Sequence, residues 1–512
     1  MTSSTDVPLA PSPAARVRLD HVRILDVAHG RYLEPDVSLI LHEGRIESLP
    51  GHEGQPTDRR ADQAIDLGGR VAIPGLCSSH NHLQLVLPAH LLGLQDLWLA
   101  GRHGPRQVER NMADCLLHGV TLVRDAWSEN LALNRRLREK IRRSEIPGPR
   151  IRQSVLVSQH GGTFAQRRHL GDRIIGRLAG IPLIPYENPA SGVVAFPADA
   201  SARMVREAVN RALDERGAEC IKLYDQRERK ITYEPGPTLM TQEQLDAAAD
   251  QARRRGVPST LHHVTVESFR RGVRAGVTSL VHVPTDGPLA PEDLRAFVAA
   301  GCILEPTLSL AYDLNWALPG CPQPDASRLG RLGQFREASY EGMVRRFWLP
   351  ELQPSALAGL GKVKAGRTRV FGLLELGRVF RYFAGLCGPG MDNTRAVFAA
   401  GGKLACGNDA GALPRTPAMV GLELALIDFA LREGGGRLSG ADALRIATLH
   451  GALALGLADR FGSLEPGKTA DIAILDRDPL TDPPVLGGPV AALFLGGRLA
   501  VNRCGLHSAP AS

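Results

Sequence analysis

The chain lacks the patterns that mark several common classes of protein. Its 8 cysteines form no C-x-x-C pair, so neither a zinc ribbon nor a thioredoxin-like redox motif is expected. No apolar run reaches the ~18 residues that a membrane-spanning helix needs, and residues 1–16 lack the apolar core of a signal peptide. Several of the cysteines fall in apparent strands, where they act as small apolar residues, so we expect a reducing compartment and a cytoplasmic protein. Because no long apolar run is present, we expect no membrane partner.

Lysine is scarce in this sequence. Of the 61 basic residues only 7 are lysine, and the formal net charge is +7. The basic residues are scattered and no aromatic side chains alternate with them, so no nucleic-acid partner is expected. A lysine at an inward-facing position of such an arginine-rich chain therefore points to chemistry that arginine cannot perform.

Both ends of the chain show short strand-like runs separated by turns. We expect residues 1–16 to be a disordered tail, and 17–71 and 460–505 to form one small composite β domain, a β-sandwich built from both chain ends. Residues 72–459 would form the larger domain, interrupted by a mainly helical insert at about 311–395. The insert is either a structural extension or a lid that shapes the substrate pocket.

Strands and helices alternate in the larger domain. This order predicts an α/β fold with a parallel sheet, and seven or eight repeats favour a (β/α)8 TIM-type barrel, whose active site lies where the strands end. The expected strands are 121–124, 150–157, 220–224, 259–262, 279–282, 303–308 and 403–406. The expected helices include 202–216, 241–255 and 266–275.

Two histidines follow the short apolar strand 70–73 and a Pro-Gly step. His80 and His82 are two residues apart, so in an extended segment both side chains lie on one face. Both imidazoles can then bind one metal ion.

Lys222 is predicted to face the barrel interior. It alternates with Ile221 and Leu223, which we expect to pack on the helices. A buried lysine is costly unless it is paired or modified, and only a neutral amine can add CO2 to become a carbamate, an anionic ligand. The alternative is a lysine paired with a carboxylate.

Three further candidate ligands stand at the ends of predicted strands. His262 and His282 close successive strands, so a shared metal could bind both. Asp409 follows the last strand and is suited to bind a metal and to act as general base.

Several motifs together resemble the metal-dependent amidohydrolase superfamily, closest to its imidazolonepropionase-like and Xaa-Pro dipeptidase-like branch. The likeness extends over about residues 17–500 and includes the 20-residue step from His262 to His282. The motifs are Ile73-Pro74-Gly75-Leu76 leading to His80-Asn81-His82, then residues 119–125, 146–151, 274–282, 407–411 and 462–471.

The resemblance implies a ligand set and a reaction. His80, His82 and Asp409 would hold one Zn²⁺, His262 and His282 a second, and carboxylated Lys222 would bridge the two. A metal-bound hydroxide would cleave an amide or related C–N bond, and Asp409 would transfer its proton to the leaving amine.

The substrate is less well defined by the sequence. We expect a small molecule such as an N-acyl amino acid or a dipeptide, whose carboxylate Tyr224, Arg227 and Arg229 could bind, although a solvated charged loop is an equal alternative. Dipeptidase-like relatives often carry a histidine directly after a Gly-Gly pair, whereas here His160 precedes the pair. We expect His160 to take the part of that histidine in substrate binding. Ser78 replaces an aspartate common in relatives.

Two other functions remain open at this point. One is a mononuclear deaminase or imidazolonepropionase-like cyclic amidohydrolase in which Lys222 is unmodified. The other is a catalytically inactive binding scaffold, which the complete ligand set disfavours. The resemblance also leaves a homo-oligomer open.

Overall fold

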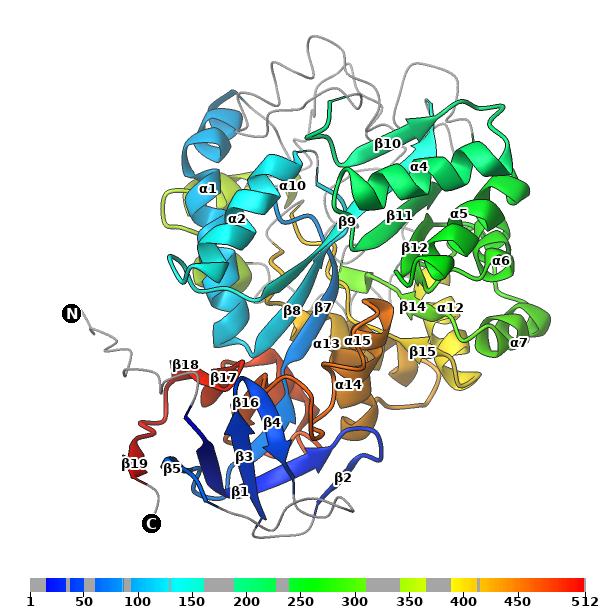
Figure 1. The fold of residues 1–512 in the computed structure, drawn as a ribbon. Coiled ribbons are helices and arrows are strands. Elements are labelled where there is room, and N and C mark those ends of the chain that lie inside the picture. Colours follow the sequence, from blue (N-terminus) through cyan, green and yellow to red (C-terminus); the bar gives the residue numbers. More distant parts are fainter. Residues whose placement is uncertain are drawn as a thin grey trace.

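The computed structural model describes most of the chain as two sheets with flanking helices (Figure 1). No helix in the described part of the chain is both long and apolar enough to cross a membrane. Most of the predicted tail and much of the predicted insert lie outside the described residues. The structure describes 15–33, 37–49, 60–84, 86, 94–128, 130–160, 188–226, 239–309, 341–364, 388–411 and 415–510.

The larger sheet is a parallel barrel. Its eight successive strands pair in chain order, and β10 (Val193–Phe196) adds to the third of them. The predicted barrel is therefore confirmed, although three strands end earlier than expected, at Val281, Glu305 and Leu404. The strands are β7 (Leu76–Asn81), β8 (Val120–Asp125), β9 (Arg150–Gln159), β11 (Cys220–Asp225), β12 (Ser259–His263), β13 (Ser279–Val281), β14 (Ile303–Glu305) and β15 (Lys403–Leu404).

Backbone hydrogen bonds close the barrel between its first strand and the segment after its last. Ser79 N donates to Cys406 O at 2.7 Å, and Asp409 N donates to His80 O at 2.9 Å. His82 N donates to the carbonyl of Ala410 at 2.7 Å. Closure thus brings two segments more than 300 residues apart into contact at the carboxyl end of β7.

Helices cover the outside of the barrel. Ser201, Thr241 and Thr265 cap their helices by accepting backbone N–H bonds, as such residues commonly do at helix starts. These helices are α1 (Leu94–Leu117), α2 (Leu131–Arg142), α4 (Ala202–Asp214), α5 (Gln242–Arg254), α6 (Val266–Ala275), α7 (Pro291–Ala299) and α12 (Pro389–Ala399), with α13 (Val420–Arg432), α14 (Gly440–Ala447) and α15 (Leu449–Ala454) after the last strand.

The second sheet joins the two chain ends, as predicted. Figure 1 shows the blue N-terminal and red C-terminal strands together at one end of the barrel. The predicted borders of this domain, 17–71 and 460–505, stay a proposal, and the sheet itself extends to Pro74 in β6 and to Pro510 in β19. Its elements are β1 (Val17–Asp26), β2 (Arg31–Tyr32), β3 (Val37–His42), β4 (Arg45–Ser48), β5 (Gln63–Asp66), β6 (Val71–Pro74), β16 (Ile472–Leu475), η3 (Pro483–Gly487), β17 (Ala492–Leu495), β18 (Arg498–Asn502) and β19 (Ser508–Pro510).

The described part of the predicted insert packs against α1. It includes α10 (Gln353–Lys364) and a helical turn region at 341–347. The side chain of Gln107 donates to Phe347 O at 2.9 Å and accepts from Leu349 N at 2.8 Å. The last residues of the predicted insert begin α12, which continues to Ala399 and packs on α13. Whether the insert covers the substrate pocket stays a prediction.

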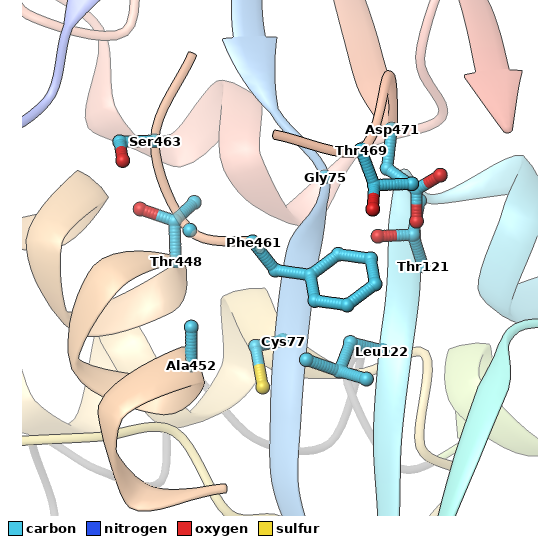
Figure 2. Close-up of a pocket in the computed structure, with 11 residues that line it drawn as sticks. Gly75, Cys77, Thr121, Leu122, Thr448, Ala452, Phe461, Ser463, Thr469 and Asp471 are labelled. Carbon is cyan, nitrogen blue, oxygen red and sulfur yellow. The ribbon is translucent and has the colours of Figure 1, made fainter. Parts of the chain in front are cut away.

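A small cavity lies where the barrel meets the chain-end domain, far along β7 from its carboxyl end. Figure 2 shows the ring of Phe461 beside Leu122 and below Thr469 and Asp471. The cavity has room for about one water molecule, so it suits structural hydration rather than a substrate.

A buried ion pair crosses the barrel interior. Arg124 on β8 and Glu305 on β14 are both 0% exposed, and Arg124 Nη2 lies 2.7 Å from each carboxylate oxygen. Ser79 Oγ donates to Glu305 at 2.6 Å, and Thr260 Oγ1 accepts from Arg124 at 3.4 Å. The ion pair and its two hydrogen-bond partners therefore link β7, β8, β12 and β14 in the buried interior of the barrel.

Removing only the cation of this pair should destabilise the barrel strongly. Arg124→Met leaves the Glu305 carboxylate buried without its partner, and we expect a loss of about 3–5 kcal/mol in the free energy of unfolding. The double variant Arg124→Met/Glu305→Leu should lose clearly less, because no uncompensated charge remains. Urea unfolding of both variants tests this; a single variant as stable as the parent protein would contradict it.

Candidate metal centre

Three predicted ligands converge at the carboxyl end of the barrel. The ligand atoms of His80, His282 and Asp409 all lie within 4.8 Å of one another. Asp409 Oδ1 is 3.2 Å from His80 Nε2 and also 3.2 Å from Nε2 of His82. The two histidines predicted as a pair, one at the end of β7 and one directly after it, thus both contact a single carboxylate oxygen of Asp409.

Two of these residues are held in an uncommon backbone conformation. His282 has φ of 70° and Asp409 has φ of 46°. Thr307, one strand further on, has φ of 51°, and the Glu423 carboxylate accepts the next N–H, that of Leu308, at 2.7 Å. Left-handed backbone at non-glycine residues costs free energy and clusters at functional sites, where the surrounding structure maintains it.

Hydrogen bonds select the ring nitrogens of two histidines. His82 Nδ1 lies 3.3 Å from Trp127 O, a carbonyl that can only accept, so Nδ1 carries a proton. Nε2, which faces Asp409, is therefore the nitrogen that can bind a metal once any proton on it is released. His282 Nδ1 lies 2.6 Å from the Thr307 hydroxyl, which itself donates to Pro306 O at 2.7 Å. That hydroxyl must accept from His282, so Nε2 is again the nitrogen suited to bind a metal.

His262 stands beside this group, with its ring centroid 4.5 Å from that of His282. Its Nε2 lies 2.9 Å from Gln226 Oε1, and its ring stacks on Tyr224 with centroids 4.4 Å apart. The proposed second metal site would lie on this side. His263 points elsewhere: its Nδ1 donates to the carbonyl of Val281 at 2.9 Å.

Lys222 lies inside the barrel, as its alternation with apolar neighbours predicted. Ile221 and Leu223 are fully buried in the core, while Lys222 is 5% exposed and its Nζ has no hydrogen-bond partner. Burial, followed by the positive charge of Arg124, lowers the pKa of Lys222 to about 7. A large share of this amine is therefore neutral near pH 7, the form that can add CO2.

The protonation states of the cluster suit a cation. Burial lowers the pKa of His80 and of His262 well below the usual value, so both are neutral near pH 7. Burial alone would raise the pKa of Asp409, but hydrogen bonds from His80 and His82 outweigh it and hold the pKa well below the usual value. Burial alone would lower the pKa of His82, but the contact with Asp409 outweighs it and raises the pKa of that imidazole. The neutral imidazoles of His80 and His262, an ionised carboxylate and a buried amine without a partner fit a metal site.

The predicted substrate contacts are less well placed. His160 is exposed directly after β9, where its backbone N–H donates to Phe196 O at 2.8 Å. Tyr224 already donates its hydroxyl to Gln226 at 2.7 Å. Arg227 and Arg229 lie outside the described residues. All four roles in substrate binding stay predictions.

Sequence reasoning missed two residues that orient the histidines, Gln226 and Thr307. The available signal was an alternation that continues past the strand ends: Gln226 extends the inward series of Lys222 and Tyr224, and Thr307 that of Glu305.

A parallel barrel with histidines and an aspartate at the carboxyl ends of its strands is typical of metal-dependent enzymes. Residues 71–500 match the amidohydrolase family. The chain belongs to the amidohydrolase family, which confirms the resemblance and the prediction of an enzyme that acts on C–N bonds.

The chain shares only limited sequence similarity with the individual proteins that it matches. The chain is 49% identical to a 5-methylthioadenosine/S-adenosylhomocysteine deaminase of Teredinibacter turnerae over 51 residues, 10% of this chain and 11% of that protein. A Xaa-Pro dipeptidase structure with bound methionine superposes with a TM-score of 0.61 at 19% identity, covering 94% of this chain and 99% of the other. An A. niger ochratoxinase structure gives 0.62 at 19% identity, covering 96% of each. These structures share the fold.

Metal uptake by protein from which bound metal has been removed should depend on pH and on bicarbonate. The lowered pKa makes Lys222 mainly protonated at pH 6 and mainly neutral at pH 8, so carboxylation and Zn²⁺ loading should rise between the two when bicarbonate is present. Zn²⁺ per chain, measured after gel filtration, checks this. Lys222→Arg is the control that should lose the bicarbonate effect; equal loading in all samples would contradict the role of Lys222.

Proposed function

We propose that this amidohydrolase is a binuclear metal enzyme that hydrolyses an amide or related C–N bond. The observation that carries the proposal is Lys222: a buried amine without a partner, inside a barrel whose rim holds the converging His80, His82 and Asp409. A neutral amine can bind a cation or add CO2, whereas a protonated amine would need a carboxylate within hydrogen-bond reach, and no described carboxylate bonds to Nζ.

The residues divide between two metals. His80, His82 and Asp409 would hold the first, His262 and His282 the second, and carboxylated Lys222 would bridge them. Zn²⁺ is the proposed ion, since imidazole and carboxylate oxygen suit it; when bound it acidifies water and polarises a carbonyl. Asp409 would accept a proton at Oδ1 or Oδ2 and return it to the leaving nitrogen.

The proposed substrate is an N-acyl amino acid or a dipeptide. The Xaa-Pro dipeptidase fold likeness supports this class, and the surrounding chain offers Tyr224 at the site with Arg227 and Arg229 a few residues further on. The described cysteines are free, which agrees with the proposed cytoplasmic location.

A mononuclear enzyme is the second candidate. His80, His282 and Asp409, whose ligand atoms all lie within 4.8 Å of one another, suffice for one ion. The short match is to a deaminase, the class that we gave above as the mononuclear alternative. In that case Lys222 would stay an unmodified amine. Metal content distinguishes the candidates, since it would be near one ion per chain rather than two.

Substitution of Lys222 tests the proposed bridge, and substitution of Asp409 tests the proposed base. Lys222→Ala should reduce Zn²⁺ well below two ions per chain, whereas Asp409→Asn should lower turnover of N-acyl amino acids or dipeptides by about 10²–10⁴-fold. Elemental analysis and a substrate screen measure the two effects, with circular dichroism to verify folding. Full metal content and full activity in Lys222→Ala would refute the bridge.

A further inference from the structure

Gln226 occupies an unassigned position next to the proposed second metal site. It directly follows β11 and is 5% exposed. Its Oε1 lies 2.9 Å from Nε2 of His262 and 2.7 Å from the hydroxyl of Tyr224. One amide oxygen therefore faces two donors.

The backbone at this point is firmly anchored. Asp225 lies between Tyr224 and Gln226 in the sequence and pairs with Arg271 of α6 at 2.9 Å. The side chains of Asp225 and Arg271 are 2% and 11% exposed. Arg271 also donates to the carbonyl of Met240. Tyr224 lies opposite His262 in the β11–β12 ladder. The position of Gln226 is therefore set by strand pairing and a buried ion pair.

These contacts fix both the tilt and the proton of the His262 ring. The Tyr224 ring stacks on it at an interplanar angle of 15°, which limits tilting. The amide oxygen of Gln226 can only accept, so His262 Nε2 must donate, and Nδ1 keeps the lone pair. The ring nitrogen left for a metal is therefore Nδ1, unlike in His82 and His282.

We infer that Gln226 is a positioning residue that presents Nδ1 of His262 to the second metal. The inference rests on the proposed binuclear function and adds to it a residue that binds no metal itself. Partners of this kind orient the ligand and set its tautomer, and their loss typically weakens metal binding by about 10–100-fold.

Two variants distinguish a positioning role from a packing role. Gln226→Glu keeps an oxygen that accepts from Nε2, so it should retain the tautomer. Gln226→Leu keeps side-chain bulk but has no acceptor. Tyr224→Phe is the matched control, because it removes the other donor to Gln226 while keeping the ring that stacks on His262.

The first measurement uses the metal-free protein. Long-range ¹H–¹⁵N correlation spectra report which nitrogen of His262 is protonated, with its signal assigned from its absence in His262→Gln. We expect protonation at Nε2 in the parent protein, in Gln226→Glu and in Tyr224→Phe, and a mixture of tautomers in Gln226→Leu. Protonation at Nδ1 in the parent protein would overturn the inference without involving metal or activity.

The second measurement is calorimetric titration with Zn²⁺. In Gln226→Leu we expect one of two sites to weaken by about 10–100-fold while the other is unchanged, with Gln226→Glu and Tyr224→Phe close to the parent protein. Two unchanged sites in Gln226→Leu would overturn the inference alone. A parent protein that binds no second Zn²⁺ would instead overturn the binuclear function.

Discussion

The site depends on the contact that closes the barrel. Asp409 N donates to His80 O at 2.9 Å, and the same residue's carboxylate oxygen lies 3.2 Å from two imidazole nitrogens. The backbone bonds between β7 and residues 406–410 thus fix the carboxylate against the His80 and His82 pair. Any change that broke these backbone bonds would move the ligands apart even if every ligand residue were still present.

The chain-end domain supports the same strand from the other side. β6 belongs to that domain and leads through Gly75 into β7, while Gly75 N donates to Asp471 O at 2.9 Å. A Cβ at Gly75 would lie 2.1 Å from Thr121 Oγ1, so only glycine allows β7 to lie this close to β8. The strand that carries His80 and leads directly into His82 is therefore held at its start by one domain and at its end by barrel closure.

The sequence predicted what depends on local periodicity. The i, i+2 spacing of His80 and His82 and the alternation around Lys222 indicated which side chains face inward, and repeated strand–helix units indicated the barrel. The Arg124–Glu305 pair and the Gln226–His262 bond were not predicted, because each joins strands whose register is set only in three dimensions. The left-handed turns at His282 and Asp409 also lack a glycine or asparagine signal at those positions.

The most direct test of the two-metal account is a crystal structure with anomalous diffraction at the zinc edge. The account expects two peaks, one among His80, His82 and Asp409 and one beside His262 and His282, joined by a carbamate on Lys222. A single peak with an unmodified Lys222, or no peak in protein supplied with Zn²⁺ and bicarbonate, would contradict it.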